Sequence, residues 1–194
     1  IDLLHENGIA VDLGTPSAVW VGPGFDDAAA AALGEFGAAT VYVADAADLA
    51  AHPVAPKAEV LASLVAEKAP VAVLIASTAD GKEVAGRLAV RTDSGVITDA
   101  VAVSAELVAT QSVFGGSTVV HSSVTRGTPI FTVRPNSTAP VAAATTPART
   151  DVSVTLSEAA TKATVTGHTA ATKGGRPELT EAAIVVSGGR GVGG

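Results

Sequence analysis

Short runs of β-branched and apolar residues alternate with alanine-rich stretches over the first 75 or so residues, and this alternation constrains the fold more than any other feature. Strands are expected at residues 18–21, 40–44 and 71–75, and helices at residues 26–36 and 57–68. Each strand run is continuously apolar, which is typical of strands buried on both faces of a sheet. The pattern therefore predicts βαβ units on a mostly parallel sheet.

The third strand leads into a loop, residues 77–82, and then a further helix. Asp80 is placed to cap that helix, and Glu83 follows three residues later, as in a capping box. The helix start lies at the carboxyl edge of the sheet, where open α/β folds bind ligands. Lys82 and the free N–H groups of the loop suit a phosphate. The alternative, which we favour, is that Asp80 caps those donors and repels an anion.

The pattern changes after Gly95, where alternating stretches are separated by Gly-Gly and Arg-Gly-Thr-Pro turns. Antiparallel strands are expected at residues 97–103, 106–114, 117–124 and 129–133. Residues 135–150, rich in Pro, Ala, Ser and Thr, indicate a loop or linker, and residues 151–156 and 163–169 indicate two further extended pieces.

Composition narrows the classes of function. A net charge of -7 opposes nucleic-acid binding, which needs clustered Lys and Arg. The chain has no Cys, which excludes disulfides, thiolate metal sites and a cysteine nucleophile. No apolar stretch approaches the length of a membrane span. The chain has no Met, and its first residues indicate the end of a helix with Gly8 just past it, so both ends are expected to be cut.

A predicted strand at residues 182–186 runs directly into Ser187-Gly188-Gly189-Arg190-Gly191-Val192-Gly193-Gly194. Glycines at positions 189, 191 and 194 match the G-x-G-x-x-G spacing, in which backbone N–H groups approach a pyrophosphate with no Cβ in the way. From the pattern alone, a nucleotide-binding turn and a flexible glycine-rich tail are equally good interpretations. Arg190 favours the first, since a guanidinium suits a phosphate or a flavin ring.

The remaining polar residues do not indicate a catalytic site. The histidines, at positions 5, 52, 121 and 168, have no metal-ligand spacing and lie beside no nucleophile motif. Arg87 and Arg91, four residues apart on one helix, are expected to be packing or interface residues. No hydrolase, zinc-protease or P-loop motif is found.

Three segments together resemble the α subunit of electron-transfer flavoprotein, in the same order and spacing. They are residues 77–89, Phe114-Gly115-Gly116 followed by residues 128–135, and residues 176–191, which contain Arg-Pro-Glu-Leu-Thr and Ser-Gly-Gly-Arg-Gly. The last segment is the most specific. The resemblance covers nearly the whole chain.

The resemblance implies a three-layer αβα scaffold of the adenine nucleotide α-hydrolase-like kind with added antiparallel strands. It implies an N-terminal α/β scaffold domain at residues 1–134, a linker with extended strands at residues 135–175, and the start of an FAD-binding domain at residues 176–194. Arg190, with Gly189 and Gly191, would lie at the edge of the FAD site and help to stabilise the anionic flavin. Two departures are that the usual first strand is missing before Ile1 and that residues 6–15 form a longer connection than expected.

The family carries electrons from flavin dehydrogenases, such as those that oxidise acyl-CoA, to a respiratory acceptor. The resemblance therefore implies an electron carrier, not a substrate-transforming enzyme, that pairs with a β subunit in the bacterial cytoplasm or the mitochondrial matrix. The structural AMP belongs to the β subunit, so the loop at residues 77–82 is expected to be empty. Two alternatives stay open: an adenine-nucleotide-binding module that uses this loop, and a dinucleotide-dependent oxidoreductase that begins at Ala182.

Overall fold

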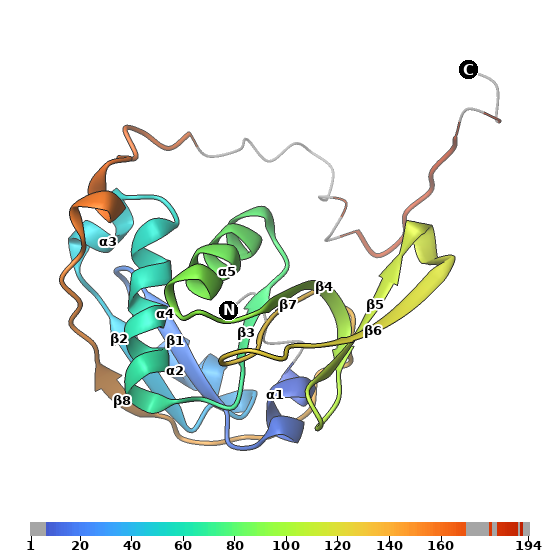
Figure 1. The fold of residues 1–194 in the computed structure, drawn as a ribbon, viewed down its shortest axis with the longest axis horizontal. Helices are drawn as coiled ribbons and strands as arrows, with labels where there is room; N and C mark the ends of the chain where they lie inside the picture. The colour runs from blue at the N-terminus through green and yellow to red at the C-terminus, as the bar shows by residue number, and fades with distance from the viewer. Residues whose placement is uncertain (1–6, 170–178, 180–181, 190, 192–194) are drawn as a thin grey trace. The chain divides into compact units, whose positions relative to one another are not determined.

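The computed structural model describes residues 7–169, 179, 182–189 and 191 (Figure 1). The chain divides into two compact units, Ile1–Thr164 and Val165–Gly194. Every helix and strand with assigned bounds lies in the first unit. The α-helices are α1 (Asn7–Leu13), α2 (Asp27–Glu35), α3 (Ala47–Ala51), α4 (Ala55–Lys68) and α5 (Ala79–Arg91), and the 3-10 turns are η2 (Phe114–Gly116) and η3 (Glu158–Thr161). The strands are β1 (Ser17–Val21), β2 (Thr40–Ala44), β3 (Val73–Ala76), β4 (Val96–Val103), β5 (Val108–Val113), β6 (Thr118–Ser123), β7 (Ile130–Val133) and β8 (Ala148–Asp151).

The strands form two sheets. The first has three parallel strands in the order β1-β2-β8. The second has five strands in the order β3-β7-β4-β5-β6, of which β3, β7 and β4 are parallel and β5 and β6 are antiparallel. This arrangement confirms the predicted α/β class. The antiparallel strand expected at residues 129–133 is wrong, however, because β7 lies between β3 and β4 and runs parallel to both. The antiparallel pairs are β4 with β5 and β5 with β6.

Alternate side chains of the central strand β7 pack against helices on opposite faces of its sheet. Ile130 contributes to a cluster with Ala85, Leu88 and Ala89 of α5. Phe131 and Val133 contribute to a second cluster that includes Ile9 of α1. In the first sheet, Val41 and Val43 of β2 pack with Leu33 of α2, whereas Tyr42 packs with Val60 and Leu64 of α4. Helices therefore cover both faces of each sheet, as in a three-layer αβα fold.

An open cavity of about 1160 Å³ lies between β1 and β3. Consecutive residues of both strands line it, among them residues 17–19 of β1 and residues 73–76 of β3. Successive side chains of a strand point to opposite faces of the sheet. Because consecutive residues of β1 and of β3 line the cavity, it is the edges of these strands, not their faces, that border it. Among the described strands, β1 pairs only with β2, and β3 pairs only with β7. The expectation that these runs are buried on both faces is therefore wrong for β1, where Val19 is 38% exposed.

Three local predictions are wrong for physical reasons. Gly8 lies inside α1, because Ile9, 5% exposed, extends the helix into the core, and Gly14, with φ 142°, follows its end. The extended piece at residues 151–156 forms a strand three residues earlier, where β8 finds the free edge of β2. Residues 163–169 form no strand.

The strand expected at residues 182–186 is also absent from the structure. Ile184 is 84% exposed and Val186 is 93% exposed. A strand needs a neighbour to satisfy its backbone hydrogen bonds, and none of the described strands pairs with this segment.

Residues 135–164 belong to the first unit, and hydrogen bonds join them to the rest of it. Thr145 donates its backbone N–H to the oxygen of Gly34 at 2.8 Å and its hydroxyl to the oxygen of Ala38 at 2.5 Å. Ala148 donates its N–H to the oxygen of Ala39 at 2.9 Å, and β8 then extends the first sheet. The part of the chain expected to be a linker thus begins as a docked segment.

Candidate functional site

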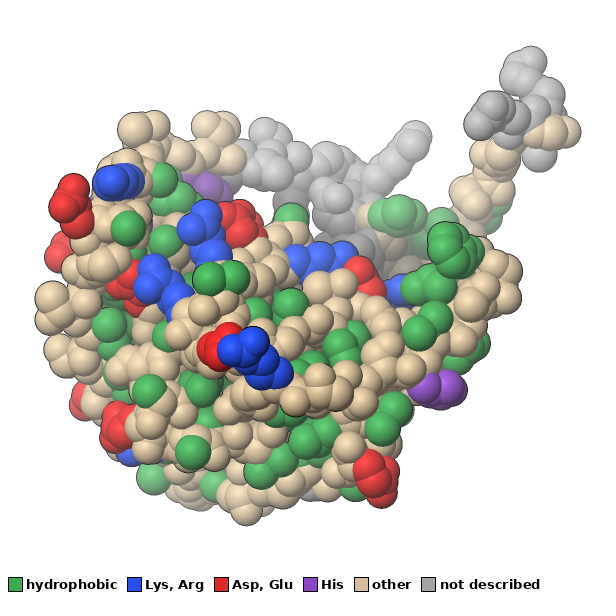
Figure 2. Space-filling view, in the orientation of Figure 1, with side chains coloured by type: hydrophobic (Ala, Val, Ile, Leu, Met, Phe, Trp, Pro, Cys, Tyr) green, Lys and Arg blue, Asp and Glu red, His purple; other side chains and the backbone are tan. Residues whose placement is uncertain are grey.

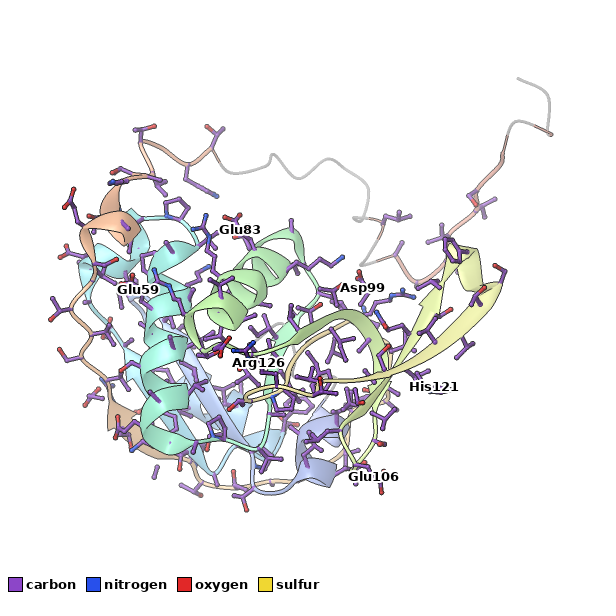
Figure 3. All side chains as sticks on the ribbon, in the orientation of Figure 1. Glu59, Glu83, Asp99, Glu106, His121 and Arg126 are labelled. Atoms are coloured by element: carbon purple, nitrogen blue, oxygen red, sulfur yellow. The ribbon has the colours of Figure 1, made fainter. Side chains whose placement is uncertain are left out.

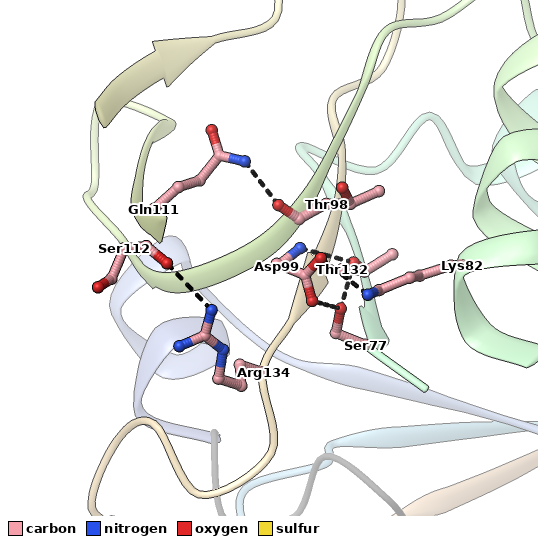
Figure 4. A network of polar contacts seen from close by, with 8 residues as sticks. All are labelled: Ser77, Lys82, Thr98, Asp99, Gln111, Ser112, Thr132 and Arg134. Atoms are coloured by element: carbon pink, nitrogen blue, oxygen red, sulfur yellow. Dashed lines mark hydrogen bonds and ion pairs between the residues drawn. The ribbon is translucent and has the colours of Figure 1, made fainter. Parts of the chain in front are cut away.

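Five polar residues gather where β3 and β7 end, beside the register shift in the middle of β4, and we call them the polar cluster (Figures 3 and 4). They are Ser77, Lys82, Asp99, Thr132 and Arg134. Ile75 pairs with Thr132 and Ala76 with Val133, so Ser77 emerges beside the end of β7. This is the edge at which open α/β sheets place ligands.

Thr132 is the buried centre of the polar cluster, with 0% exposure. Its Oγ1 accepts a hydrogen bond from the backbone N of Asp99 at 3.1 Å and lies 2.9 Å from the hydroxyl of Ser77. Ser77 donates its single hydroxyl hydrogen to Oδ1 of Asp99 at 2.8 Å, so Thr132 is the donor in the bond that joins the two hydroxyls. The polar groups within this strand region therefore satisfy one another.

Asp99 takes its position from an irregularity in β4. The pairing register between β4 and β7 shifts between Ile97 and Ala100, and Asp99 has φ 57°. An aspartate tolerates this left-handed conformation better than most residues, because its short side chain makes local hydrogen bonds. The irregularity turns the carboxylate toward Ser77 and Lys82, where a regular strand would continue its alternation.

Lys82 forms an ion pair with Asp99, with 2.8 Å between Nζ and Oδ2. The hydrogen bond from Lys82 is the largest cause of a lowered pKa at Asp99; burial opposes it, and Ser77 and the charge of Arg134 support it. Arg134 donates from Nη2 to the oxygen of Ser112 at 3.2 Å. The carboxylate of Asp99 is therefore ionised at neutral pH. It is paired with Lys82, the cation that a phosphate would need at this place.

The start of α5 is capped by Thr78, not by Asp80 as the sequence indicated. Oγ1 of Thr78 accepts a hydrogen bond from the N–H of Gly81 at 3.0 Å. Asp80 lies in the first turn, and Glu83 pairs with Arg87 at 2.7 Å, so the capping box is not formed. Thr78 takes the cap because α5 begins at Ala79 and the backbone of Thr78, with φ -86° and ψ 172°, has the extended conformation of an N-cap residue.

Both arginines of α5 make ion pairs, which agrees with the packing role expected for them. Arg87 binds Glu83 on the same helix, whereas Arg91 binds Glu59 of α4 at 2.7 Å. Glu59 is only 8% exposed, and the sequence did not indicate it.

The histidines that the structure describes are separate from one another. Nδ1 of His52 lies 2.7 Å from the oxygen of Ala163, and Nδ1 of His121 lies 3.2 Å from Oγ1 of Thr110. His168 is exposed, and His5 lies outside the described residues. Among the described residues, no group of three or more His, Asp and Glu side chains is arranged to hold a metal ion.

The predicted cofactor residues are placed only in part. Gly189 and Gly191 are exposed, and a Cβ added at either would meet no atom within 4 Å. Arg190 lies outside the described residues. The two glycines leave the backbone open to a ligand, but the described neighbours form no cradle around them, so no chemical step can be assigned to this turn. None of the described helices is long and apolar enough to cross a membrane.

Sequence reasoning selected Lys82 but missed Asp99, Thr132 and Arg134. One signal for Thr132 was present: it is the single polar residue in the buried run Ile130–Val133. A hydroxyl in such a run must have a partner nearby.

Comparison with known proteins gives a consistent result. The profile of the electron transfer flavoprotein domain matches residues 6–172. The chain is 44% identical over 182 residues to the electron transfer flavoprotein subunit alpha of Mycobacterium leprae, covering 93% of this chain and 57% of that protein. The subunit alpha of Mycobacterium tuberculosis is 45% identical over 123 residues, which is 63% of this chain and 39% of that protein.

The subunit alpha of Syntrophomonas wolfei is 33% identical over 183 residues, covering 90% of this chain and 56% of that protein. The chain thus spans little more than half the length of these relatives. The matched region contains the polar cluster and each strand that the structure describes, from β1 to β8. On these grounds, the chain belongs to the electron transfer flavoprotein family.

Proposed function

We propose that this chain is the scaffold part of the α subunit of an electron carrier that binds FAD and pairs with a β subunit. The observation that carries the proposal is the match of residues 6–172 to the family profile. Two relatives that align with 90% or more of this chain are both named as α subunits. The residues at 1–134 would form the scaffold domain, residues 135–175 the linker, and residues 176–194 the start of the FAD-binding domain.

The polar cluster supports a scaffold role in preference to nucleotide binding. Lys82, in the first turn of α5, is paired with the chain's own Asp99. The hydroxyl of Thr78 accepts the hydrogen bond that the N–H of Gly81 would otherwise offer to a ligand. A phosphate at this place would have to displace the carboxylate or lie against it. The structural AMP of the carrier is accordingly assigned to the β subunit.

In the proposed carrier, Arg190 with Gly189 and Gly191 lies at the edge of the FAD site. FAD supplies the redox chemistry when bound, and a fixed guanidinium favours negative charge on the flavin. The protein would accept electrons from flavin dehydrogenases, such as those that oxidise acyl-CoA, and pass them to a respiratory acceptor in the cytoplasm, without transforming a substrate of its own.

The proposal is tested by purifying the intact protein together with its β subunit and recording the absorption spectrum. We expect a flavin band, FAD on extraction, and bleaching of the band when a reduced flavin dehydrogenase is added. A protein that takes up no flavin on incubation with FAD would overturn the proposal.

The nucleotide-binding alternative is tested on this chain by calorimetry with ATP and with AMP. The carrier proposal predicts no binding by the loop at residues 77–82. Binding that is lost in a Lys82→Met variant and kept in a variant of the exposed Lys162, Lys162→Met, would favour the nucleotide-binding module.

A further inference from the structure

The segment of residues 152–163, which we call the strap, crosses the first unit between β8 and the end of that unit (Figure 1). Its first half is held by apolar packing. Val152, Val154 and Leu156 pack against the cluster formed by Ala44, Leu49, Val60 and Leu64. Val152 also donates its N–H to the oxygen of Val43 at 2.8 Å, continuing the pairing of β8 with β2.

The second half of the strap is held by Glu59. Oε2 of Glu59 accepts the backbone N–H of Ser157 at 2.9 Å, and Oε1 accepts the hydroxyl of Ser157 at 2.5 Å. Arg91 of α5 donates from Nη2 to the same Oε1 at 2.7 Å. A carboxylate that is 8% exposed thus joins α4, α5 and the strap through charge-assisted hydrogen bonds.

The contacts end shortly after this point. Ser157 caps η3 by accepting the N–H of Ala160 at 3.3 Å, and Ala160 is 2% exposed. Nδ1 of His52 lies 2.7 Å from the oxygen of Ala163. Residues 162–169 are exposed, and the division between the two units falls at Thr164.

We infer that Glu59 is a positioning residue that fixes the last anchored point of the first unit, from which a tether leads to the FAD-binding domain expected at residues 176–194. With the strap docked, the tether runs from Thr164 to the expected domain start at Arg176. That is about 12 residues, which reach at most ~40 Å. Without Glu59, the apolar half of the strap stays in place. We expect η3 to leave with Ser157, because only the small side chain of Ala160 and the exposed bond of His52 then hold it. The tether would start at Ser157 and grow to about 19 residues, by the same count.

The consequence rests on the proposed function, in which the C-terminal unit belongs to a mobile FAD domain. The effective concentration of one domain at the other falls with the length of the chain that joins them. We therefore expect the longer connection to lower it, by about twofold for a −3/2 power dependence. The contact between Glu59 and Ser157 does not depend on flavin and can be tested without it.

The test uses the intact protein with Glu59→Gln, with Ser157→Ala, and with the control Glu83→Gln, which breaks the exposed ion pair with Arg87 but does not touch the strap. Hydrogen exchange is measured at the amides of Ser157 and Ala160, with the amide of Val152 as an internal reference. We expect exchange at Ser157 and Ala160 to rise roughly tenfold or more in the Glu59 variant, with Val152 unchanged.

A second readout follows the tether directly. The 194 residues contain no cysteine, so spin labels can be placed at Ser63→Cys on α4 and at Leu179→Cys, which is 73% exposed and lies outside the glycine turn. Double electron–electron resonance measures the distribution of distances between the two labels. We expect this distribution to be about a quarter wider in Glu59→Gln than in the wild type or in Glu83→Gln, because its width scales with the square root of tether length. A purely stabilising role would leave this width unchanged at temperatures well below unfolding.

Unchanged exchange at Ser157, or faster exchange with an unchanged distance distribution, would overturn the inference. If Glu59→Gln does not fold, Ser157→Ala decides through the distance distribution. It keeps the pair between Glu59 and Arg91, whereas exchange at Ala160 rises in this variant in any case, because its N–H loses the hydroxyl that accepts it. A protein that binds no flavin but shows both effects would overturn the proposed function and leave this inference standing.

Discussion

Gly81 of α5 packs directly on the carbonyl oxygen of Ala76, so that a methyl group on its Cα would overlap that oxygen. The contact brings the first turn of α5 against the end of β3 and sets Lys82 within reach of Asp99. Backbone cannot yield to a side chain as a flexible side chain can. A single glycine therefore determines how closely the helix approaches the sheet.

We predict that Gly81→Ala destabilises the protein by about 3 kcal/mol or more, since the helix must move away from the sheet. The matched control is Gly86→Ala on the same helix, where the added methyl would meet no atom within 4 Å. That change should stabilise the protein by roughly 0.5–1 kcal/mol through helix propensity. Urea unfolding of both variants measures the difference. Equal effects would contradict the close-packing argument.

The stability that Glu59 contributes should depend on pH. Burial raises the pKa of Glu59, but the hydrogen bonds from Ser157 and the interaction with Arg91 outweigh it, and the net pKa is lowered from 4.5. A lowered pKa means that the folded state favours the ionised carboxylate. The contribution is then complete above the unfolded pKa and is lost as the pH falls through the folded value.

Glu59→Gln should therefore cost about 2 kcal/mol near pH 7 and progressively less below about pH 4.5. Free energies of unfolding at a series of pH values check this, with Glu83→Gln as the exposed control. A cost that stays constant into acid would show that the charge of Glu59 is not responsible.

Two variants of Asp99 separate the stability that depends on its backbone conformation from the stability that depends on its charge. Asp99→Asn keeps a side chain that accepts φ 57° and removes the charge paired with Lys82. Both partners are about 40% exposed, so we expect a loss below about 1 kcal/mol. Asp99→Val should cost roughly 2 kcal/mol more, because a β-branched residue is strained in this conformation. Similar losses in the two variants, measured by thermal unfolding, would refute the backbone argument.

Sequence periodicity predicted most of the scaffold because the pattern is local to each element. The run at residues 40–44 was predicted to the residue as β2, and the helix at residues 57–68 lies within α4. β8 could not be predicted in the same way. All four of its residues are exposed, and it is a strand only because the edge of β2 is available to it.

The polar cluster was only half predictable. The loop at residues 77–82 follows a strand and precedes a helix, so position alone indicated Lys82. Asp99 lies inside a predicted strand, and nothing in the pattern of residues 97–103 shows the register shift that turns it toward Lys82. Glu59 looks like an ordinary polar helix residue, because its partner Ser157 is distant in the chain and joins it only in the folded state.

Arg190, which lies outside the described part of the structure, is the cofactor residue that the proposed function implies. In the intact protein we expect Arg190→Ala to make the reduction potential of the bound flavin more negative, because a fixed positive charge no longer stabilises the anionic flavin. A reductive titration followed by absorption measures the potential. Arg149→Ala, which removes an exposed arginine of β8, is the control and should leave the potential unchanged.

The cavity between β1 and β3 leads to a last prediction. Among the described strands, β1 and β3 each have one unpaired edge, and both edges face the same cavity, so one more strand placed there would join the two sheets into one. The helix α1 enters β1 and also lines the cavity, which places the end of a βαβ unit beside the gap. We therefore expect the amides on these two edges to exchange quickly in this chain and slowly in a longer chain that supplies such a strand. The amides of β7, which is paired on both sides, serve as the reference in both chains. Fast exchange at β1 and β3 in the longer chain, with β7 protected, would show that the cavity does not accept a strand.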